Sequence, residues 1–239
     1  MTGDQPPIVI GFPLFDGADL MDITGPMEVL GSLPQPPKIM IKLIGKSTAK
    51  AVTLIPGKVR VLPDTTFADC PPLTVIAVPG GSGILEVFED KSYLDFVRDQ
   101  AARARFVVGV CAGSLVLAVA GLLDGHTATT HWASLCVLGL FPEVTLAPGY
   151  PRYVISGNRI TTGGVTSGLD MALALGAILS GETSAKESQL IVQYAPRPPY
   201  HAGDPDIADP VTLAGANARL EKLIQRRIEA VRKLLHPGP

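Results

Sequence analysis

The chain has 239 residues, of which 46% are hydrophobic and 18% are charged, and its net charge at pH 7 is −2. Folded soluble proteins carry about a quarter of charged residues, so this chain can bury a large core and is not intrinsically disordered over most of its length. The balanced charge excludes the strongly basic character typical of nucleic-acid-binding proteins.

The cysteines and the apolar segments indicate a reducing compartment. Cys70, Cys111 and Cys136 are odd in number and unevenly spaced, which argues against a disulfide framework, and no cysteine or histidine cluster has zinc-site spacing. The N-terminal residues lack the basic start and apolar core of a secretory signal. The longest apolar stretch, residues 106–123, is interrupted by glycines and too short to span a membrane. We therefore expect a cytoplasmic protein.

Segments typical of strands and helices alternate along the first half of the chain. In chain order we expect a strand at 8–12, a helix at 19–33, strands at 39–44, 52–54, 59–62 and 74–78, a helix at 90–104 and a strand at 106–110. The pair Gly25-Pro26 predicts an interruption of the first helix, which would restart with proline in its first turn.

The second half begins with a hairpin expected within residues 144–161, with a Gly-Asn turn. Helices should follow up to residue 179 and at 182–193, and the proline-rich residues 194–210 predict a loop lying over the body. Residues 213–235 have the apolar periodicity of an amphipathic helix. Its cationic side chains are expected to form a solvated face: Arg219, Lys222, Arg226, Arg227, Arg232 and Lys233.

This order of elements predicts an α/β protein. The strand expected at 106–110 has no polar face, which is typical of a parallel sheet covered by helices on both sides. We expect a three-layer α/β/α sandwich with a mostly parallel central sheet and right-handed crossovers. Residues 1–210 would form one domain, and residues 211–239 an amphipathic helix packed on that domain or on a dimer partner.

The strongest chemical signal is the segment 109–113, Gly-Val-Cys-Ala-Gly. An apolar strand leads into a cysteine with a glycine two residues away on each side, and an apolar helix follows. This pattern is the cysteine form of the nucleophile elbow, in which glycines permit a sharp turn between strand and helix. Cys111 would then lie at a helix N-terminus, which favours a thiolate. Cys70 and Cys136 are expected to be buried structural cysteines.

Other residues could complete a site around Cys111. Gly80 and Gly81 follow the neighbouring strand at its carboxyl end, where α/β proteins bind ligands, and their N–H groups with that of Ala112 could stabilise negative charge. Asp22, embedded in apolar residues, is a candidate proton carrier whose pKa should rise on burial. Its alternative role is N-cap of the helix expected to restart near Pro26.

His131, in the segment Thr-Thr-His-Trp at 129–132, has two possible roles. It could take part in catalysis, or it could be a core or capping histidine. Asp170 is a candidate for orienting it. Sequence spacing leaves both roles open.

These segments together resemble the PfpI-like branch of the class I glutamine-amidotransferase-like superfamily. The resemblance lies in the acid segment Met-Asp-Ile-Thr-Gly-Pro at 21–26, Val-Pro-Gly-Gly at 78–81, the elbow and Thr-Thr-His-Trp. Further similar segments lie at 66–73, 100–105 and 194–200, so the resemblance covers about residues 7–210. Within this branch the chain is similar to the isocyanide (isonitrile) hydratases in particular.

The resemblance implies a flavodoxin-like fold and a homodimer, with Cys111 as nucleophile and Asp22 as the acid that hydrogen-bonds the thiol. Gly81 and Ala112 match positions whose N–H groups face the cysteine, and His131 matches a histidine near the site. The implied activity is hydration of a small-molecule isocyanide to an N-substituted formamide through a Cys111 thioimidate. No metal and no organic cofactor is implied, and no nucleic acid or membrane partner.

Ala112 departs from two patterns within the superfamily. Peptidase-like relatives carry a histidine after the cysteine, so a Cys-His dyad is absent at this position. By the same resemblance, the isocyanide hydratases carry a threonine at this position. This chain has alanine there, so it lacks a hydroxyl group beside the thiol.

Two other functions remain open. The same thiol could form a hemithioacetal with an α-oxoaldehyde, as in glyoxalase-like and deglycase-like relatives, although Asp22 is shorter than the glutamate of that branch. Alternatively, the domain could sense a ligand or cysteine oxidation without catalysis. Similar domains precede a helix-turn-helix domain in transcription regulators, but residues 211–239 are too short for such a domain.

Overall fold

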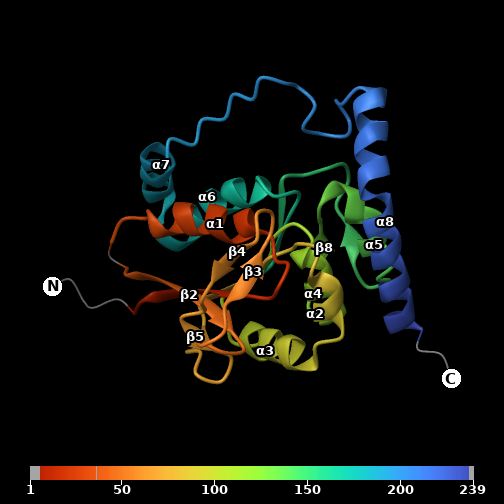
Figure 1. Cartoon of the computed structure of the whole chain (residues 1–239). Coiled ribbons are helices and arrows are strands. Elements are labelled where there is room, and N and C mark those ends of the chain that lie inside the picture. Colours follow the sequence, from red (N-terminus) through yellow and green to blue (C-terminus); the bar gives the residue numbers. More distant parts are fainter. Residues whose placement is uncertain (1–5, 36, 237–239) are drawn as a thin grey trace.

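The computed structural model describes residues 6–35 and 37–236, and its centre is a mixed β-sheet (Figure 1). The sheet has the strand order β10-β11-β7-β6-β1-β2-β5, and every neighbouring pair is parallel except the hairpin β10–β11. The strands are β1 (Ile8–Pro13), β2 (Ile39–Gly45), β5 (Thr65–Thr66), β6 (Val75–Val78), β7 (Phe106–Gly109), β10 (Tyr153–Ser156) and β11 (Arg159–Thr162).

Helices cover both faces of the sheet (Figure 1). One face carries α1 (Leu20–Gly31), α6 (Ser167–Ser180) and α7 (Glu182–Ile191), and the other carries α2 (Ile84–Phe88), α3 (Lys91–Ala101) and α4 (Gly113–Val119). Beside the second face, α5 (Leu135–Leu138) contacts α8 (Pro210–Leu235). The predicted three-layer α/β/α sandwich with a mostly parallel sheet is therefore confirmed.

Two pairs of short strands lie outside the main sheet. The antiparallel pair β3 (Val52–Leu54) and β4 (Val59–Val61) is the expected hairpin. The parallel pair β8 (Thr127–Ala128) and β9 (Thr145–Leu146) differs from the prediction, because residues 145–146 were expected in the late hairpin. The helices α2 and α5 and the strand β5 were not predicted either, since each is too short to show a full period in the sequence.

The expected interruption of the first helix is wrong, because α1 continues through Gly25-Pro26. Pro26 cannot donate a hydrogen bond to the carbonyl of Asp22 four residues earlier. Both Gly25 and Pro26 are nevertheless buried, and a Cβ placed on Gly168 of α6 would lie only 3.2 Å from the proline ring. Close packing between α1 and α6 thus compensates for the missing hydrogen bond.

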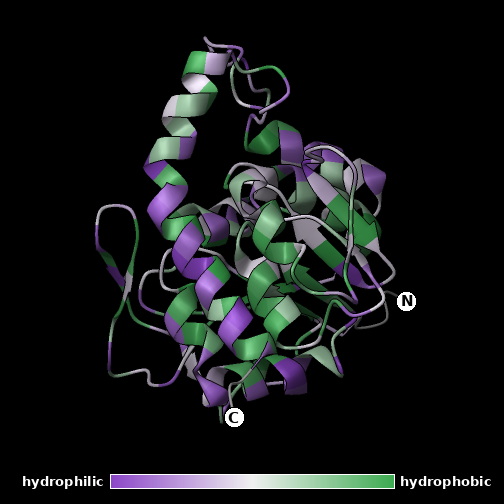
Figure 2. Ribbon diagram, turned by 90° about the vertical axis from the view of Figure 1, so that its right-hand side faces the viewer, coloured by the Kyte–Doolittle hydropathy of each residue, from purple (hydrophilic) through white to green (hydrophobic). Residues whose placement is uncertain are grey.

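The long helix α8 is amphipathic, and Figure 2 shows hydrophilic and hydrophobic residues mixed along its C-terminal part. Its N-cap Asp209 accepts hydrogen bonds from the N–H groups of Val211 and Thr212. It packs against α5, α2 and the single 3₁₀ turn Trp132–Ser134. Within residues 6–35 and 37–236, no helix combines the length and apolar composition needed to cross a membrane.

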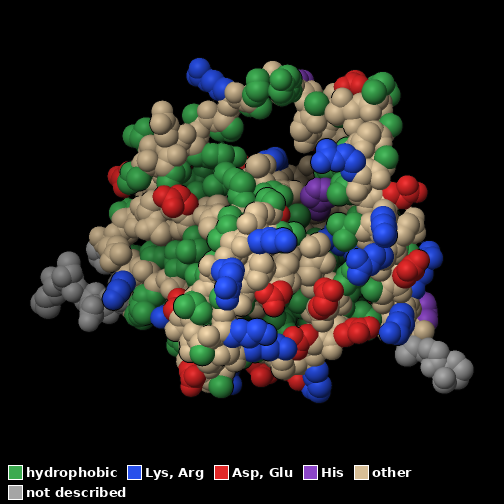
Figure 3. All heavy atoms as spheres, viewed as in Figure 1, with side chains coloured by type: hydrophobic (Ala, Val, Ile, Leu, Met, Phe, Trp, Pro, Cys, Tyr) green, Lys and Arg blue, Asp and Glu red, His purple; other side chains and the backbone are tan. Residues whose placement is uncertain are grey.

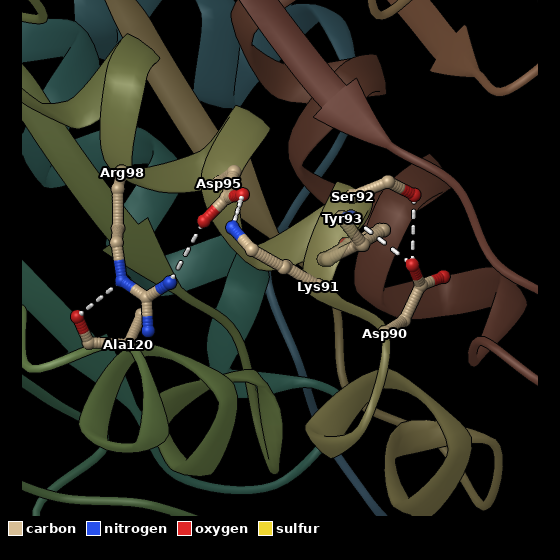
Figure 4. A network of polar contacts seen from close by, with 7 residues as sticks. All are labelled: Asp90, Lys91, Ser92, Tyr93, Asp95, Arg98 and Ala120. Carbon is tan, nitrogen blue, oxygen red and sulfur yellow. Dashed lines mark hydrogen bonds and ion pairs between the residues drawn. The ribbon is translucent and has the colours of Figure 1, made fainter.

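Polar contacts fix both ends of α3 (Figure 4). Its N-cap Asp90 accepts a hydrogen bond from the N–H of Tyr93 at 3.2 Å and from the hydroxyl of Ser92 at 2.8 Å. Near the other end, Arg98 Nε donates to the carbonyl of Ala120 at 3.1 Å. The second contact connects α3 to the C-terminal end of α4, the helix that follows the elbow.

The core beneath α3 is organised around Tyr93, which is 1% exposed. Its hydroxyl donates a hydrogen bond to the carbonyl of Pro13 at the end of β1, at 2.8 Å. The rings of Phe15 and Phe67 approach it edge-on, each with a centroid distance of 5.7 Å. Tyr93 therefore contributes both apolar area and a hydrogen bond to a buried backbone carbonyl.

Tyr93→Phe should reduce the free energy of unfolding by about 1–3 kcal/mol, because it leaves the buried carbonyl of Pro13 without a donor. Urea denaturation followed by circular dichroism measures this difference. Tyr200→Phe is the matched control, since Tyr200 is 81% exposed. Equal stability of the Tyr93 variant and the wild type would show that the hydrogen bond contributes nothing.

Candidate active site

Cys111 lies in the sharp turn between β7 and α4, and the predicted elbow is confirmed. Its φ is +54°, a conformation that residues with a Cβ rarely adopt. A Cβ on Gly109 would lie 2.8 Å from the amide nitrogen of Ser114, and one on Gly113 would lie 2.1 Å from the carbonyl oxygen of Val78. Both glycines are therefore required by close backbone contacts, and the strained conformation of Cys111 is held by its surroundings.

Two threonines hold the backbone of Cys111 in this conformation. The hydroxyl of Thr162, at the end of β11, accepts a hydrogen bond from the N–H of Cys111 at 3.0 Å. The hydroxyl of Thr130 donates to the carbonyl of Cys111 at 2.9 Å. Sequence reasoning missed both roles, because the two contacts join residues 51 and 19 positions apart in the chain.

Asp22 lies in the first turn of α1 and is fully buried. Its Oδ2 accepts a hydrogen bond from the N–H of Gly80 at 2.8 Å, whereas Oδ1 has no hydrogen-bond partner among the described residues. The alternative role as N-cap is wrong, because Asp19 caps α1 by accepting the N–H of Met21 at 3.0 Å. Asp22 is thus a buried carboxyl with one oxygen anchored and one oxygen free.

Burial determines the protonation of both Asp22 and Cys111. It raises the pKa of Asp22 well above its ordinary value, and the negative charge of Asp19 raises it further, while the N–H of Gly80 and the thiol of Cys111 lower it. Burial also raises the pKa of the Cys111 thiol, as does the charge of Asp22, while the N–H of Ala112 lowers it. The expected stabilisation of a thiolate by the helix N-terminus is therefore present but smaller than the cost of burial.

The two groups consequently titrate as a pair. A carboxylate at Asp22 disfavours a thiolate at Cys111, and a protonated Asp22 removes that repulsion. Ionisation of both groups would bury two negative charges, whereas loss of one proton leaves the pair with one negative charge and one shared proton. One of its two forms, a thiolate beside a carboxylic acid, combines a nucleophile with a proton donor.

The glycine turn after β6 positions Asp22 and approaches the elbow closely. The N–H of Gly80 already binds Asp22, so it is not free to bind an anion, contrary to the expectation for this residue. A Cβ on Gly80 would lie 2.6 Å from the nitrogen of Ala112. Gly81 has a φ of +129°, and a Cβ there would lie 2.2 Å from the carbonyl oxygen of Gly17. Ala112 thus lies close to Gly80, and Gly81 follows Gly80 directly in the turn.

His131 caps the 3₁₀ turn that follows it, since its Nδ1 accepts the N–H of Ala133 at 3.3 Å. Burial and the charge of Arg227 lower the pKa of His131 to about 4, so the ring is neutral at pH 7. Because Nδ1 is an acceptor, the proton of the neutral ring lies on Nε2. Asp170 does not orient this histidine: it pairs with Arg152 and accepts the hydroxyl of Tyr194.

His131 lines a pocket of about 210 Å³ next to the elbow. Thr130, which donates to the carbonyl of Cys111, forms part of the pocket wall, together with Trp132, Tyr150 and Gly164. Residues 203–205 close one side of it. These residues belong to the proline-rich segment 195–209, which arches over the body and leaves a hollow beneath it, as Figure 3 shows.

Arg227 reaches the site from α8 and is only 5% exposed, so the expected solvated position is wrong for this residue. Its Nη1 donates to the hydroxyl of Ser134 at 2.8 Å, and its Nη2 donates to the carbonyl of Gly81 at 2.9 Å. The sequence contained a signal for this burial: Arg227 follows Ile224 by three positions and precedes Val231 by four, which places it on the apolar stripe of the helix.

The two other cysteines also differ from expectation. Cys70 is half-buried in a loop, and Cys136 is exposed on α5, so neither is a buried structural cysteine. Burial and the charge of Asp64 raise the pKa of Cys70 to about 11. Of the described cysteines, Cys111 alone is buried beside a carboxyl group.

Comparisons with known proteins agree with this geometry. Residues 9–177 match the sequence model of the DJ-1/PfpI family. The chain is 44% identical over 220 residues to the isonitrile hydratase of Pseudomonas putida, which covers 92% of this chain and 93% of that protein. It is 30% identical over 196 residues to the HTH-type transcriptional regulator GbdR of Pseudomonas aeruginosa, covering 78% of this chain and 51% of the regulator.

A solved structure of a THiJ/PfpI family protein from Pseudomonas syringae superposes with a TM-score of 0.87 at 34% identity, covering 95% of this chain and 92% of that one. The resemblance seen in the sequence is thereby confirmed. The family match, the superposition and the cysteine elbow lead to one conclusion: the chain belongs to the DJ-1/PfpI family.

Proposed function

We propose that this protein is an isonitrile hydratase, which adds water to R–N≡C and forms the N-substituted formamide R–NH–CHO. The observation that carries the proposal is the buried pair of Cys111 and Asp22 at the elbow, a nucleophile and an acid that change each other's pKa. The 44% identity to the isonitrile hydratase of Pseudomonas putida, over nearly the full length of both chains, supports it.

The first half of the reaction forms a covalent intermediate. The Cys111 thiolate attacks the terminal carbon of the isocyanide, so that a C–S bond forms and one C–N π bond is lost. The electron pair left on carbon takes the proton of Asp22, which gives the thioimidate R–N=CH–S–Cys111. The free Oδ1 of Asp22 is the oxygen suited to this transfer, because Oδ2 is held by the N–H of Gly80.

The second half hydrolyses the thioimidate. The Asp22 carboxylate takes a proton from water as the water oxygen bonds to carbon, and passes that proton to the nitrogen. When the carbonyl forms, Asp22 takes the remaining hydroxyl proton and the C–S bond breaks, returning its electron pair to Cys111. The product leaves as R–NH–CHO, and the acid and thiolate are regenerated without another reactant.

The other site residues have supporting roles in this proposal. The N–H groups of Gly81 and Ala112 stabilise negative charge that develops near the thiol. Gly80 holds the acid. The neutral His131 offers Nε2–H toward the 210 Å³ pocket, which takes the substituent R. No metal and no organic cofactor takes part in any of these steps.

The α-oxoaldehyde and sensor alternatives are not favoured. The isonitrile hydratase of Pseudomonas putida matches this chain over 92% of its length, whereas the chain spans about half of the regulator GbdR. We keep hydration of an isocyanide as the function.

The assembly and organisation of the protein belong to the same proposal. In this proposal residues 1–210 form the catalytic domain, residues 211–239 supply an amphipathic helix packed on that domain or on the dimer partner, and the protein is a cytoplasmic homodimer. Large apolar side chains that are strongly exposed lie on α7, on the proline-rich segment and at the start of α8: Leu190, Ile191, Tyr200 and Val211. A second copy of the chain covering them would remove this area from water.

Cys111→Ala should abolish formation of the formamide from an aryl isocyanide, because no covalent intermediate can form. Absorbance of the product measures turnover, and circular dichroism checks the fold. Cys136→Ala, at an exposed cysteine, should keep wild-type turnover. Turnover near wild type in the Cys111 variant would exclude the covalent mechanism, and no turnover in folded wild-type protein would exclude the activity.

Asp22→Asn should lower kcat about 100-fold or more, since the proton donor is lost. It should also shift alkylation of Cys111 by iodoacetamide to lower pH, because the carboxylate that raises the pKa of the thiol has been removed. The matched control is Asp99→Asn on the exposed side of α3. If the Asp22 variant has the wild-type kcat and alkylation profile, the acid has no part in the reaction.

Light scattering during size-exclusion chromatography should give about twice the chain mass of 25.1 kDa. Replacing Leu190 and Ile191 by serine should reduce the dimer fraction, because both side chains are strongly exposed in the single chain. A monomer at all concentrations would show that another role must be found for this apolar surface.

A further inference from the structure

The guanidinium of Arg227 connects three parts of the chain that the reaction depends on. We propose that Arg227 is a positioning residue of the Cys111 site, which fixes the glycine turn beside Asp22 and supplies the positive charge that balances the negative charge of the Cys111–Asp22 pair. The inference deepens the proposed hydration, but its first test does not require turnover.

The geometry shows how Arg227 fixes the turn. Its Nη2 donates to the carbonyl of Gly81 at 2.9 Å, and its Nη1 donates to the buried hydroxyl of Ser134 at 2.8 Å. Gly81 directly follows Gly80, whose N–H holds Asp22. The planar guanidinium thus fixes the carbonyl of the residue that follows the one whose N–H anchors the acid.

The charge of Arg227 has no carboxylate partner among the described residues. A buried cation of this kind is costly unless negative charge lies nearby. The charges of Cys111 and Asp22 raise the pKa of Arg227, while burial lowers it. In return, the guanidinium lowers the pKa of both Cys111 and Asp22. One shared proton on the pair therefore leaves one negative charge facing one positive charge.

The remaining titratable groups do not replace Arg227. His131 is kept neutral, in part by the charge of Arg227 itself. Asp19 is negative and raises the pKa of both Asp22 and Cys111. Arg227 is accordingly the cation whose charge acts on both members of the pair.

A packing role alone does not account for the residue. Position 227 lies on the apolar stripe of α8, where leucine or methionine would pack without burying a charge. The Nε of Arg227 is also buried without a hydrogen-bond partner among the described residues. A buried polar atom without a partner costs stability, so its presence requires another explanation. We attribute it to the positive charge of the guanidinium, which acts on Cys111 and Asp22.

The test measures the pH dependence of Cys111 alkylation by iodoacetamide, in a background with Cys70→Ala and Cys136→Ala so that one thiol reports. Arg227→Gln should shift the midpoint to higher pH by about one unit, because the cation that stabilises the thiolate is lost. Arg227→Lys keeps the charge and should remain near the wild-type midpoint. Arg226→Gln, which removes the same charge from an exposed neighbour, should change nothing.

Turnover provides a second measurement. With an aryl isocyanide, Arg227→Gln should lower kcat about tenfold or more while KM changes little, and Arg227→Lys should recover part of kcat. A folded Arg227→Gln protein with the wild-type alkylation midpoint would overturn the inference. If that variant does not fold, the lysine variant decides: a wild-type midpoint supports the role of the charge, and a raised midpoint refutes it. Wild-type protein without turnover would refute the proposed function only.

Discussion

A carboxyl group and a thiol buried side by side impose the constraint on which this site depends. Neither Asp22 nor Cys111 can ionise freely away from water, and a carboxylate at Asp22 opposes the ionisation of Cys111. Loss of both protons from the pair is therefore strongly disfavoured, and the proposed chemistry consists of moving a proton from the pair to a substrate and recovering it. Burial, usually a source of stability, acts here to hold a proton close to the nucleophile.

The fold meets this constraint by bringing backbones together more closely than side chains allow. Gly80 contacts the nitrogen of Ala112, and Gly113 contacts the carbonyl of Val78, at distances where no Cβ could be placed. The parallel strands β6 and β7 end side by side, so their two turns meet at one edge of the sheet. The first turn of α1 then adds Asp22 from the neighbouring strand connection.

Local patterns predicted the part of this arrangement that lies within single segments. The elbow could be predicted because the glycine spacing around Cys111 reflects a local turn. Asp22 could be predicted as a site residue because it is an acid among apolar residues. The continuation of α1 through Pro26 could not be predicted, because the packing of Pro26 against Gly168 is a contact between distant segments. Short elements such as α2 and α5 carry too few residues for a period to show.

The polar contacts around the elbow were harder to predict for the same reason. Thr162 and Arg227 come from segments far along the chain, and a pattern of residues does not state which segments will meet. The position of Arg227 on an apolar stripe indicated burial, but not what would accept its hydrogen bonds. Charged residues that interrupt a hydrophobic stripe therefore merit examination as candidates for buried functional contacts.

The contact between Arg227 and Gly81 joins residues 146 positions apart, and that between Gly80 and Asp22 joins residues 58 apart. Contacts of such long range carry the entropy cost of closing the chain between them, so they exist only where that chain is folded. In the unfolded chain, Cys111 is therefore an ordinary thiol without its acid or its cation. Because burial and Asp22 raise the pKa of this thiol in the folded protein, the loss of rapid alkylation during refolding would report the native population directly.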